Sequence, residues 1–245
     1  MSLTRIDGRL WNENRPITII PSFQSSAEGS VLIETGNTKV ICAASIEDRV
    51  PSFLTGLGKG WVTAEYDMLP RATNTRSSRD RNNGQINGRA QEIQRLIGRS
   101  LRAVTDLESL GERTVYMDCD VIQADGGTRT AAITGSYVAL AQALSQLTRD
   151  GVITHLPILS RVAATSVGIN NGELLLDLCY QEDFEAEVDF NIVMNDKGTL
   201  IELQGATEAA PFDRKYIPEI IALAFKGSES LFKAQKLALD EIESL

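Results

Sequence analysis

The 245-residue chain has one histidine, three cysteines and few aromatic residues. A single histidine, His155, excludes a His-Glu-x-x-His zinc motif, so acid–base chemistry must fall mainly to carboxylates. The cysteines, Cys42, Cys119 and Cys179, form no Cys-x-x-Cys pair, and each lies inside an apolar run. An odd number of such isolated thiols is typical of a reduced protein, so we expect a cytoplasmic location.

Long apolar runs are missing as well. The first 15 residues are polar and no run approaches membrane-spanning length, so the sequence predicts neither a signal peptide nor a membrane partner. The motif Gly-x-x-x-x-Gly-Lys-Ser/Thr is absent, which excludes a P-loop nucleotide hydrolase. With 42% apolar and 23% charged residues, the chain has the composition of a folded soluble protein.

Positive charge is concentrated in one stretch, although the formal net charge is −9. Residues 71–102 carry only two acids against eight arginines, which are Arg71, Arg76, Arg79, Arg81, Arg89, Arg95, Arg99 and Arg102. The remainder carries 16 basic and 31 acidic residues. An arginine block on an acidic chain indicates a local site for a polyanion. The alternative is a solvated charge run, but such runs usually mix lysine with arginine.

The order of strand-like and helix-like segments predicts an α+β fold with mixed β-sheets packed on helices. Strand patterns occur at 17–20, 30–34, 39–46, 60–69, 114–123, 161–169, 173–180, 187–194 and 199–204. Helical patterns occur from residue 87 or 88 to about 107, over 131–147, and from about 218 to 243. We interpret residues 1–245 as a single domain. Its halves, about 1–150 and 151–245, each place strands before helices and are strand-rich, a weak sign of duplication.

A Gly-Gly turn connects the strand at 114–123 to the following helix. Gly126 and Gly127 allow a sharp turn that leaves backbone N–H groups uncovered, and a helix N-terminus adds partial positive charge. Thr128 adds a hydroxyl, and Arg129 adds a guanidinium. Together these groups predict a cradle for a phosphate-sized anion. The alternative is an ordinary strand-to-helix turn in which the glycines serve packing.

One arginine of the basic block differs from the others. The helix that begins near residue 88 has a buried stripe formed by Ile93, Leu96, Ile97, Leu101 and Val104. At 100° per residue, Arg95 and Arg99 lie opposite this stripe, whereas Arg89 lies beside it. An inward arginine must find an anion or a carboxylate partner, so Arg89 is set apart from the solvated arginines of the block.

Five carboxylates crowd residues 181–189, and two of them could share a site. On a continuous strand, Asp183 and Asp189 would lie roughly 20 Å apart. If 181–186 is a turn, Asp183 folds back towards Asp189, and the pair could hold Mg²⁺ or raise one pKa for acid catalysis. The alternative is a charged hairpin tip. Against it, Asp189 is flanked by Val188 and Phe190 in an apolar strand.

The cradle, the arginine and the aspartate pair together resemble the ribonuclease PH family, phosphate-dependent 3′ exoribonucleases of transfer-RNA maturation. The resemblance covers nearly the whole chain. Its most specific stretches are residues 60–73 (GWVTAEYDMLPRAT), 88–99 (GRAQEIQRLIGR) and 125–130 (DGGTRT). One departure is visible, since Gln-Gly-Ala-Thr-Glu at 204–208 replaces the usual Gln-Gly-Thr-Ala-Glu.

The resemblance implies a role for each candidate residue. Phosphate would be bound by Arg89, Gly127, Thr128 and Arg129, and Asp183 and Asp189 would be the catalytic and metal-binding carboxylates. Inorganic phosphate would be the co-substrate and Mg²⁺ the metal. Transfer-RNA precursors and other RNA 3′ ends, rather than DNA, would contact Arg71, Arg76, Arg79, Arg81, Arg95 and Arg99. It also implies a homohexamer built as a trimer of dimers. A non-catalytic RNA-binding ring subunit of an exosome-like assembly is the alternative.

Overall fold

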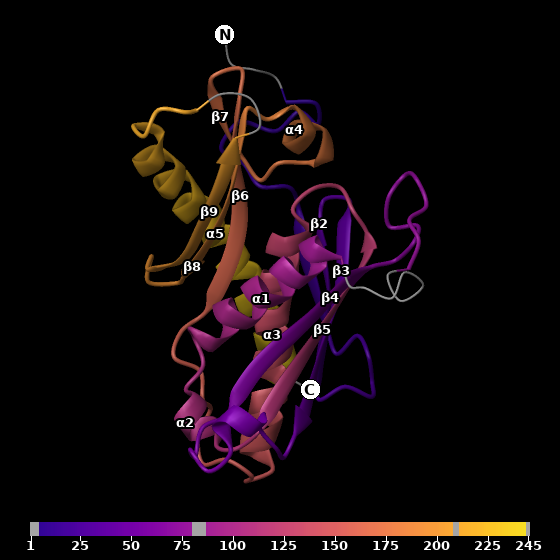
Figure 1. Ribbon diagram of the computed structural model, residues 1–245, viewed down its shortest axis with the longest axis vertical. Helices are drawn as coiled ribbons and strands as arrows, with labels where there is room; N and C mark the ends of the chain where they lie inside the picture. Colours follow the sequence, from indigo (N-terminus) through magenta and orange to yellow (C-terminus); the bar gives the residue numbers. More distant parts are fainter. Residues whose placement is uncertain (1–4, 80–86, 208–210, 244–245) are drawn as a thin grey trace.

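Two β-sheets pack around a shared central helix in the computed structural model, which describes residues 5–79, 87–207 and 211–243 (Figure 1). The predicted RNA-binding Arg81 lies outside these residues. No helix in the described ranges is long and apolar enough to cross a membrane. Cys42, Cys119 and Cys179 are all buried and free.

The first sheet has the strand order β1-β2-β3-β5-β4. Its strands are β1 (Ile17–Pro21), β2 (Gly29–Thr35), β3 (Thr38–Glu47), β4 (Trp61–Met68) and β5 (Thr114–Gln123). Neighbouring strands are antiparallel except β4 and β5, which are parallel, so this sheet has the mixed pairing expected. Alternate residues of β5, from Val115 to Val121, are buried beneath the helices, as the period of a half-buried strand requires.

Helix α3 (Thr128–Arg149) is the packing centre of the molecule. It contacts β2 and β3 of the first sheet, and also β6 of the second. Close approach depends on small residues, because a Cβ atom on Gly135 would lie 2.8 Å from the side chain of Ile33. Helix α1 (Gly88–Arg102) covers β4 beside it. The short segments η1 (Ser52–Leu54) and α2 (Leu107–Leu110) flank the far end of the sheet (Figure 1).

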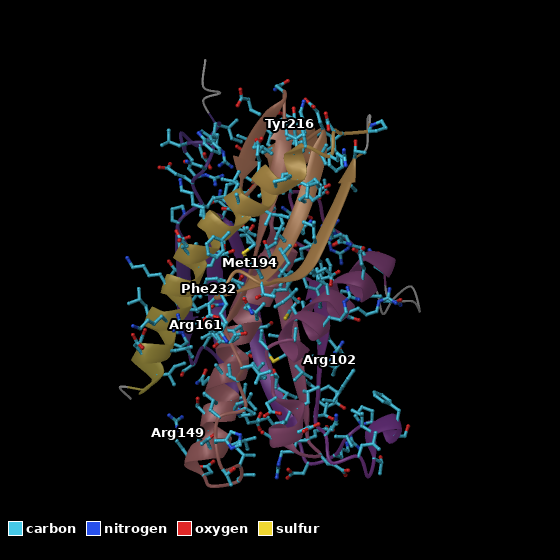
Figure 2. The ribbon with its side chains drawn as sticks, turned by 90° about the vertical axis from the view of Figure 1, so that its left-hand side faces the viewer. Arg102, Arg149, Arg161, Met194, Tyr216 and Phe232 are labelled. Carbon is cyan, nitrogen blue, oxygen red and sulfur yellow. The ribbon has the colours of Figure 1, made fainter. Side chains whose placement is uncertain are left out.

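The second sheet has the order β7-β6-β8-β9 and is antiparallel throughout. Its strands are β6 (Val162–Asn170), β7 (Glu173–Leu176), β8 (Val188–Asn195) and β9 (Leu200–Thr207). The six-residue helix α4 (Tyr180–Glu185) lies between β7 and β8. Helix α5 (Tyr216–Glu243) packs on β6, and it extends past the sheet to contact β1 and α3 (Figure 2).

Two predicted element ends were wrong. Helix α1 ends at Arg102 rather than near 107, because Thr105 forms a bridge with Ile158 and Asp106 then caps α2. Strand β7 ends at Leu176 rather than 180, because Asp177 adopts a left-handed backbone conformation (φ 52°). The second change redirects the chain into α4, and it thereby positions one of the predicted catalytic residues.

Candidate active site

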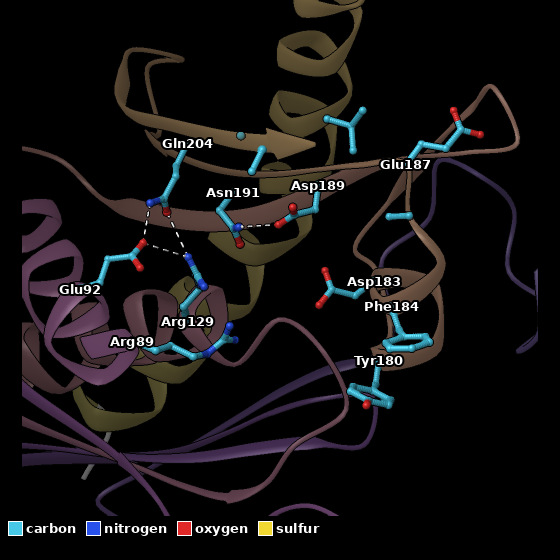
Figure 3. Close-up of a pocket in the computed structure, with 14 residues that line it drawn as sticks. Arg89, Glu92, Arg129, Tyr180, Asp183, Phe184, Glu187, Asp189, Asn191 and Gln204 are labelled. Atoms are coloured by element: carbon cyan, nitrogen blue, oxygen red, sulfur yellow. Dashed lines mark hydrogen bonds and ion pairs between the residues drawn. The ribbon is translucent and has the colours of Figure 1, made fainter. Parts of the chain in front are cut away.

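A cleft of about 510 Å³ opens between the first turns of α1 and α3 on one side and α4 with the second sheet on the other, and it brings four predicted site residues together (Figure 3). Arg89 comes from α1, Arg129 from α3, Asp183 from α4 and Asp189 from β8. Residues of β9 complete the lining. The cleft therefore places two cationic groups opposite two carboxylates, an arrangement suited to anions held beside a proton or metal site.

The two arginines of the cleft are held differently. Arg129 donates to the side-chain oxygen of Gln204 at 3.0 Å and pairs with Glu92 at 3.5 Å. Arg89 forms no ion pair within the described residues, and its backbone N–H is capped by Asn87 at 2.9 Å. Arg89 was expected to point inward beside the buried stripe of α1. At the first turn of the helix its side chain is instead exposed, and it lines the cleft. Its guanidinium is thus available to an anion.

The Gly-Gly turn lies behind the cleft rather than in its lining. Gly126 and Gly127 both have positive φ, 74° and 64°, and Gly127 is the residue before α3. The hydroxyl of Thr128 is buried and shares a 2.8 Å hydrogen bond with Tyr66. Burial raises the pKa of Tyr66, so that this phenol stays protonated and can donate to Thr128. Of the predicted cradle, only Arg129 reaches the cleft surface.

A buried ion pair holds the turn in place. The guanidinium of Arg15 binds both carboxylate oxygens of Asp177, at 2.9 and 2.7 Å. The same guanidinium donates to the backbone oxygen of Asp125. Burial alone would raise the pKa of Asp177, but the hydrogen bonds and charge of Arg15 outweigh it and hold that pKa below its ordinary value. Asp177 therefore stays ionised, and the pair joins the N-terminal segment to the turn.

A second buried ion pair holds α4. Arg5 binds both oxygens of Glu182, at 2.8 and 2.6 Å, and also donates to the backbone oxygens of Leu176, at the end of β7, and Asp177. Glu182 also accepts the backbone N–H of Cys179 at 3.1 Å. The crowded carboxylates thus divide by role, since Glu182 faces inward as an anchor while Asp183 faces the cleft. This is the folded-back arrangement, and it rules out both the continuous strand and the hairpin tip.

The two aspartates face the same part of the cleft (Figure 3). On β8, alternation turns Val188 and Phe190 into the core and leaves Asp189 and Asn191 towards the cleft. Partial burial raises the pKa of Asp183, and the charge of Asp189 raises it further, while the cleft arginines oppose both effects. A cation or a proton between the two carboxylates would relieve this repulsion.

The remaining predicted RNA-binding arginines lie outside the cleft lining. Arg71, Arg76 and Arg79 are exposed on the segment after β4, an edge strand, and this segment stands out from the sheet (Figure 1). Arg95 is exposed on α1. Arg99 forms a bidentate ion pair with Glu202 of β9, so part of its charge is neutralised there. Their contacts with RNA remain a prediction.

Several cleft residues were missed by sequence reasoning. Gln204 contacts both Arg129 and Glu92, which makes it the link between β9 and the two helices. The next residue must be glycine, because a Cβ atom on Gly205 would lie 2.1 Å from the ring of Phe190. A signal was present, since Gln204 and Gly205 begin the segment in which the sequence departs from the family pattern. The exchanged Ala206 and Thr207 lie beyond this contact.

Comparison with known proteins decides the family. Models of the 3′ exoribonuclease family match two parts of the chain, domain 1 over residues 13–145 and domain 2 over residues 160–227. The chain belongs to the 3′ exoribonuclease family. The predicted α+β fold, with mixed β-sheets packed on helices, is thereby confirmed as the fold of this family.

Individual members agree with this assignment over nearly full length. A protein named Ribonuclease PH from Dehalococcoides mccartyi is 57% identical over 234 residues, which are 96% of this chain and 97% of the relative. One from Bacillus velezensis is 58% identical over 238 residues, 97% of each chain. Among solved structures, the Archaeoglobus fulgidus exosome with RNA bound to the active site has the same fold, with a TM-score of 0.80 at 21% identity, covering 94% of this chain and 91% of the other.

The buried Arg15–Asp177 pair generates a stability prediction. Asp177→Asn leaves Arg15 charged and only partly bonded, so we expect a loss of about 3–5 kcal/mol in the free energy of unfolding near neutral pH. Because the pKa of Asp177 is lowered in the folded state, its contribution is present above the ordinary aspartate pKa and is lost as pH falls through the lowered value. Denaturant unfolding at several pH values measures both effects. The control is Asp48→Asn, which breaks an exposed pair with Arg113 and should change stability by less than about 1 kcal/mol.

The raised pKa of Asp183 predicts an effect on folding stability opposite in sign to that of Asp177. Ionisation of Asp183 is less favourable in the folded than in the unfolded chain, so this carboxylate lowers stability at neutral pH. Asp183→Asn should raise the melting temperature at pH 7 by about 1–2 °C. This increase in melting temperature should shrink as pH falls through the raised pKa of Asp183, and it should be absent below the ordinary pKa of aspartate. Thermal unfolding in phosphate-free buffer checks this, with Asp240→Asn on the exposed face of α5 as control. A lower melting temperature at pH 7 would contradict it.

Proposed function

We propose that this chain is a phosphorolytic 3′-to-5′ exoribonuclease that trims the 3′ ends of transfer-RNA precursors. The observation that carries the proposal is the meeting of Arg89, Arg129, Asp183 and Asp189 in one cleft. Identity of 57–58% to proteins named Ribonuclease PH over nearly the whole chain supports it. A non-catalytic ring subunit would need none of the four residues to face a common cleft, so the enzyme is favoured.

The reaction transfers a nucleotidyl group to inorganic phosphate. A phosphate oxygen attacks the phosphorus of the last phosphodiester, the bond to the 3′ oxygen of the preceding nucleotide breaks, and a nucleoside 5′-diphosphate leaves. The reverse reaction adds a nucleotide to an RNA 3′ end. Because the nucleophile is already an anion, no serine–histidine pair is needed, which agrees with the single histidine of the chain. The main task is to hold two phosphate groups that repel each other.

The cleft arginines are suited to this task in different ways. Arg129 is anchored by Gln204 and Glu92, so it offers a donor of fixed direction. Arg89 is free of ion pairs among the described residues, so a bound phosphate would be its first anionic partner there. The start of α3, with Gly127 and Thr128 behind Arg129, adds a positive helix end. Arg89 and Arg129 would bind and orient the attacking phosphate, and the helix end would add positive potential behind them.

The aspartates act on the departing oxygen. The 3′ oxygen of the shortened RNA must gain a proton, and Asp183, with its raised pKa, can hold a proton near neutral pH better than an ordinary aspartate. The pair also fits Mg²⁺, which is commonly bound by one or two carboxylates together with substrate phosphates and water. No group of three or more metal-ligating side chains occurs in the described parts of the chain, so substrate oxygens would complete the coordination. Bound Mg²⁺ would supply charge stabilisation for the leaving oxygen.

The assembly proposed for the chain is a homohexamer, built as a trimer of dimers. Support comes from the family and from the exposed arginine segment 71–79, six copies of which a hexameric ring would array around a central opening. In this arrangement the 3′ tail of a transfer-RNA precursor enters one cleft while its body meets arginines of the ring. The single-domain interpretation, with residues 1–245 as one unit, and the cytoplasmic location remain part of this proposal.

Phosphate dependence tests the reaction type. Incubation with RNA should release nucleoside diphosphates, and release should stop when phosphate is withdrawn. Arg89→Ala or Arg129→Ala should raise the KM for phosphate and lower kcat, together at least about tenfold in kcat/KM. The control is Arg149→Ala, at the opposite end of α3 (Figure 2). Undiminished release of nucleoside monophosphates without phosphate would contradict the proposal.

Salt dependence tests the arginine segment. Arg76→Ala and Arg79→Ala should each weaken binding of a transfer-RNA precursor. In a plot of the logarithm of the association constant against the logarithm of salt concentration, each should reduce the slope by about one unit. Binding of a short unstructured oligoribonucleotide, which reaches only the cleft, should change little. Arg49→Ala, an exposed arginine paired with Glu47, is the control. Equal losses on both RNAs would place Arg76 and Arg79 in the cleft, and a monomer in solution scattering would remove the proposed ring.

A further inference from the structure

An exposed aromatic pair borders the cleft on the side of the aspartates. Tyr180 and Phe184 occupy successive turns of α4, and their rings stack with centroids 6.3 Å apart and planes 26° apart. Both rings line the cleft beside Asp183 (Figure 3). Phe184 is 79% exposed and Tyr180 is 58% exposed. Phe184 is thus an almost bare apolar ring at the entrance to a site for anions.

The core does not explain this pair. Helix α4 is fixed from its inner side, where Glu182 is buried against Arg5. The backbone N–H of Tyr180 also donates to Asp125 at 3.2 Å. These bonds hold α4 without help from the exposed rings, and neither ring belongs to a buried core cluster of the described chain. Large exposed apolar groups next to a polar cleft indicate a ligand that has an apolar part.

The charges around the pair identify the occupant. Across the cleft are Arg89 and Arg129, which suit the phosphate groups of a nucleotide. The adjacent Asp183 suits its reacting sugar oxygen. A nucleotide held by these groups still has a flat, weakly polar base that needs a surface, and the two rings supply one on the same wall as Asp183. A protein segment seated on these rings would block the cleft entrance.

We propose that Tyr180 and Phe184 form a stacking platform for an unpaired nucleobase near the RNA 3′ end. The inference rests on the proposed exoribonuclease function. Stacking on an aromatic face tolerates every base, because each base has a π-face, and this suits an enzyme that removes successive nucleotides of varied sequence. Because Tyr180, Phe184 and Asp183 share one short helix, a base stacked on the rings binds on the same wall of the cleft as the carboxylate.

Binding without turnover provides the test. In phosphate-free buffer, where no phosphorolysis occurs, the Kd of a short unstructured oligoribonucleotide is measured for the full-length chain and its variants. Phe184→Ala should raise Kd between about fivefold and a hundredfold, which is the usual range for losing one stacked base. Phe184→Trp should restore binding, because it keeps an aromatic face. The matched control, Phe53→Ala, removes a ring that is 61% exposed but is not part of the cleft lining, and it should leave Kd unchanged.

Abasic scanning decides whether the ring meets a base. Oligomers that lack one base, moved stepwise from the 3′ end, should show one position where the missing base weakens binding to the unaltered chain but not to Phe184→Ala. The platform would be overturned if the unaltered chain and Phe184→Ala bound the complete oligomer with equal Kd. It would also be overturned if every abasic oligomer lost the same affinity for the unaltered chain. A change in the mass of the protein assembly in Phe184→Ala would instead make the phenyl ring a contact between subunits, and this would also overturn the platform.

The outcome for the platform is separable from that for the enzyme. If the unaltered chain releases no nucleoside diphosphate from RNA and phosphate, the proposed function fails whatever the binding data show. If release is normal, and Phe184→Ala has normal kcat at saturating RNA together with an unchanged Kd, only the platform fails. The platform predicts normal kcat at saturating RNA with a raised KM for RNA.

Discussion

The structure depends above all on the burial of two arginine–carboxylate pairs that join the N-terminal segment to residues 177–182 of the second half. Arg15 binds Asp177 and Arg5 binds Glu182, and each pair has further bonds to backbone oxygens. Buried charges are costly unless fully bonded, so this region tolerates few alternative arrangements. One pair positions the start of α3 and the other positions α4. Both walls of the cleft therefore depend on residues that touch no proposed substrate.

Much of the fold was predictable because its determinants are local. The strand patterns, the Gly-Gly turn and the amphipathic stripe of α1 each repeat over a few residues, so composition and spacing reveal them. Asp189 was recognisable for the same reason, since a carboxylate between Val188 and Phe190 departs from an otherwise apolar strand. The errors in element ends have causes that are not local in sequence. Thr105 bridges to Ile158, and the left-handed Asp177 is bound by Arg15.

The site was less predictable because its supports are not local. Arg15 and Asp177 are 162 positions apart, and Arg5 and Glu182 are 177 positions apart, so no periodicity connects them. Without these partners, Glu182 could not be told from Asp183 within the acidic run. The inward orientation expected of Arg89 failed for a related reason. Helical geometry gives the direction of a side chain at the first turn, but only the neighbouring sheet shows whether that direction leads to core or to a cleft.

The long sequence separation of these pairs has a consequence for how the protein is made. Chains are synthesised from the N-terminus, so the first sheet and the arginine segment 71–79 leave the ribosome before α4 and β8 exist. Arg5 and Arg15 have no carboxylate partners until Glu182 and Asp177 have been synthesised, and until then the cleft lacks its second wall. On the proposed assignment of the site, an unfinished chain can attract a polyanion through the arginine segment but cannot cleave it. Completion of the second sheet is then the step that would add the active site to this basic segment.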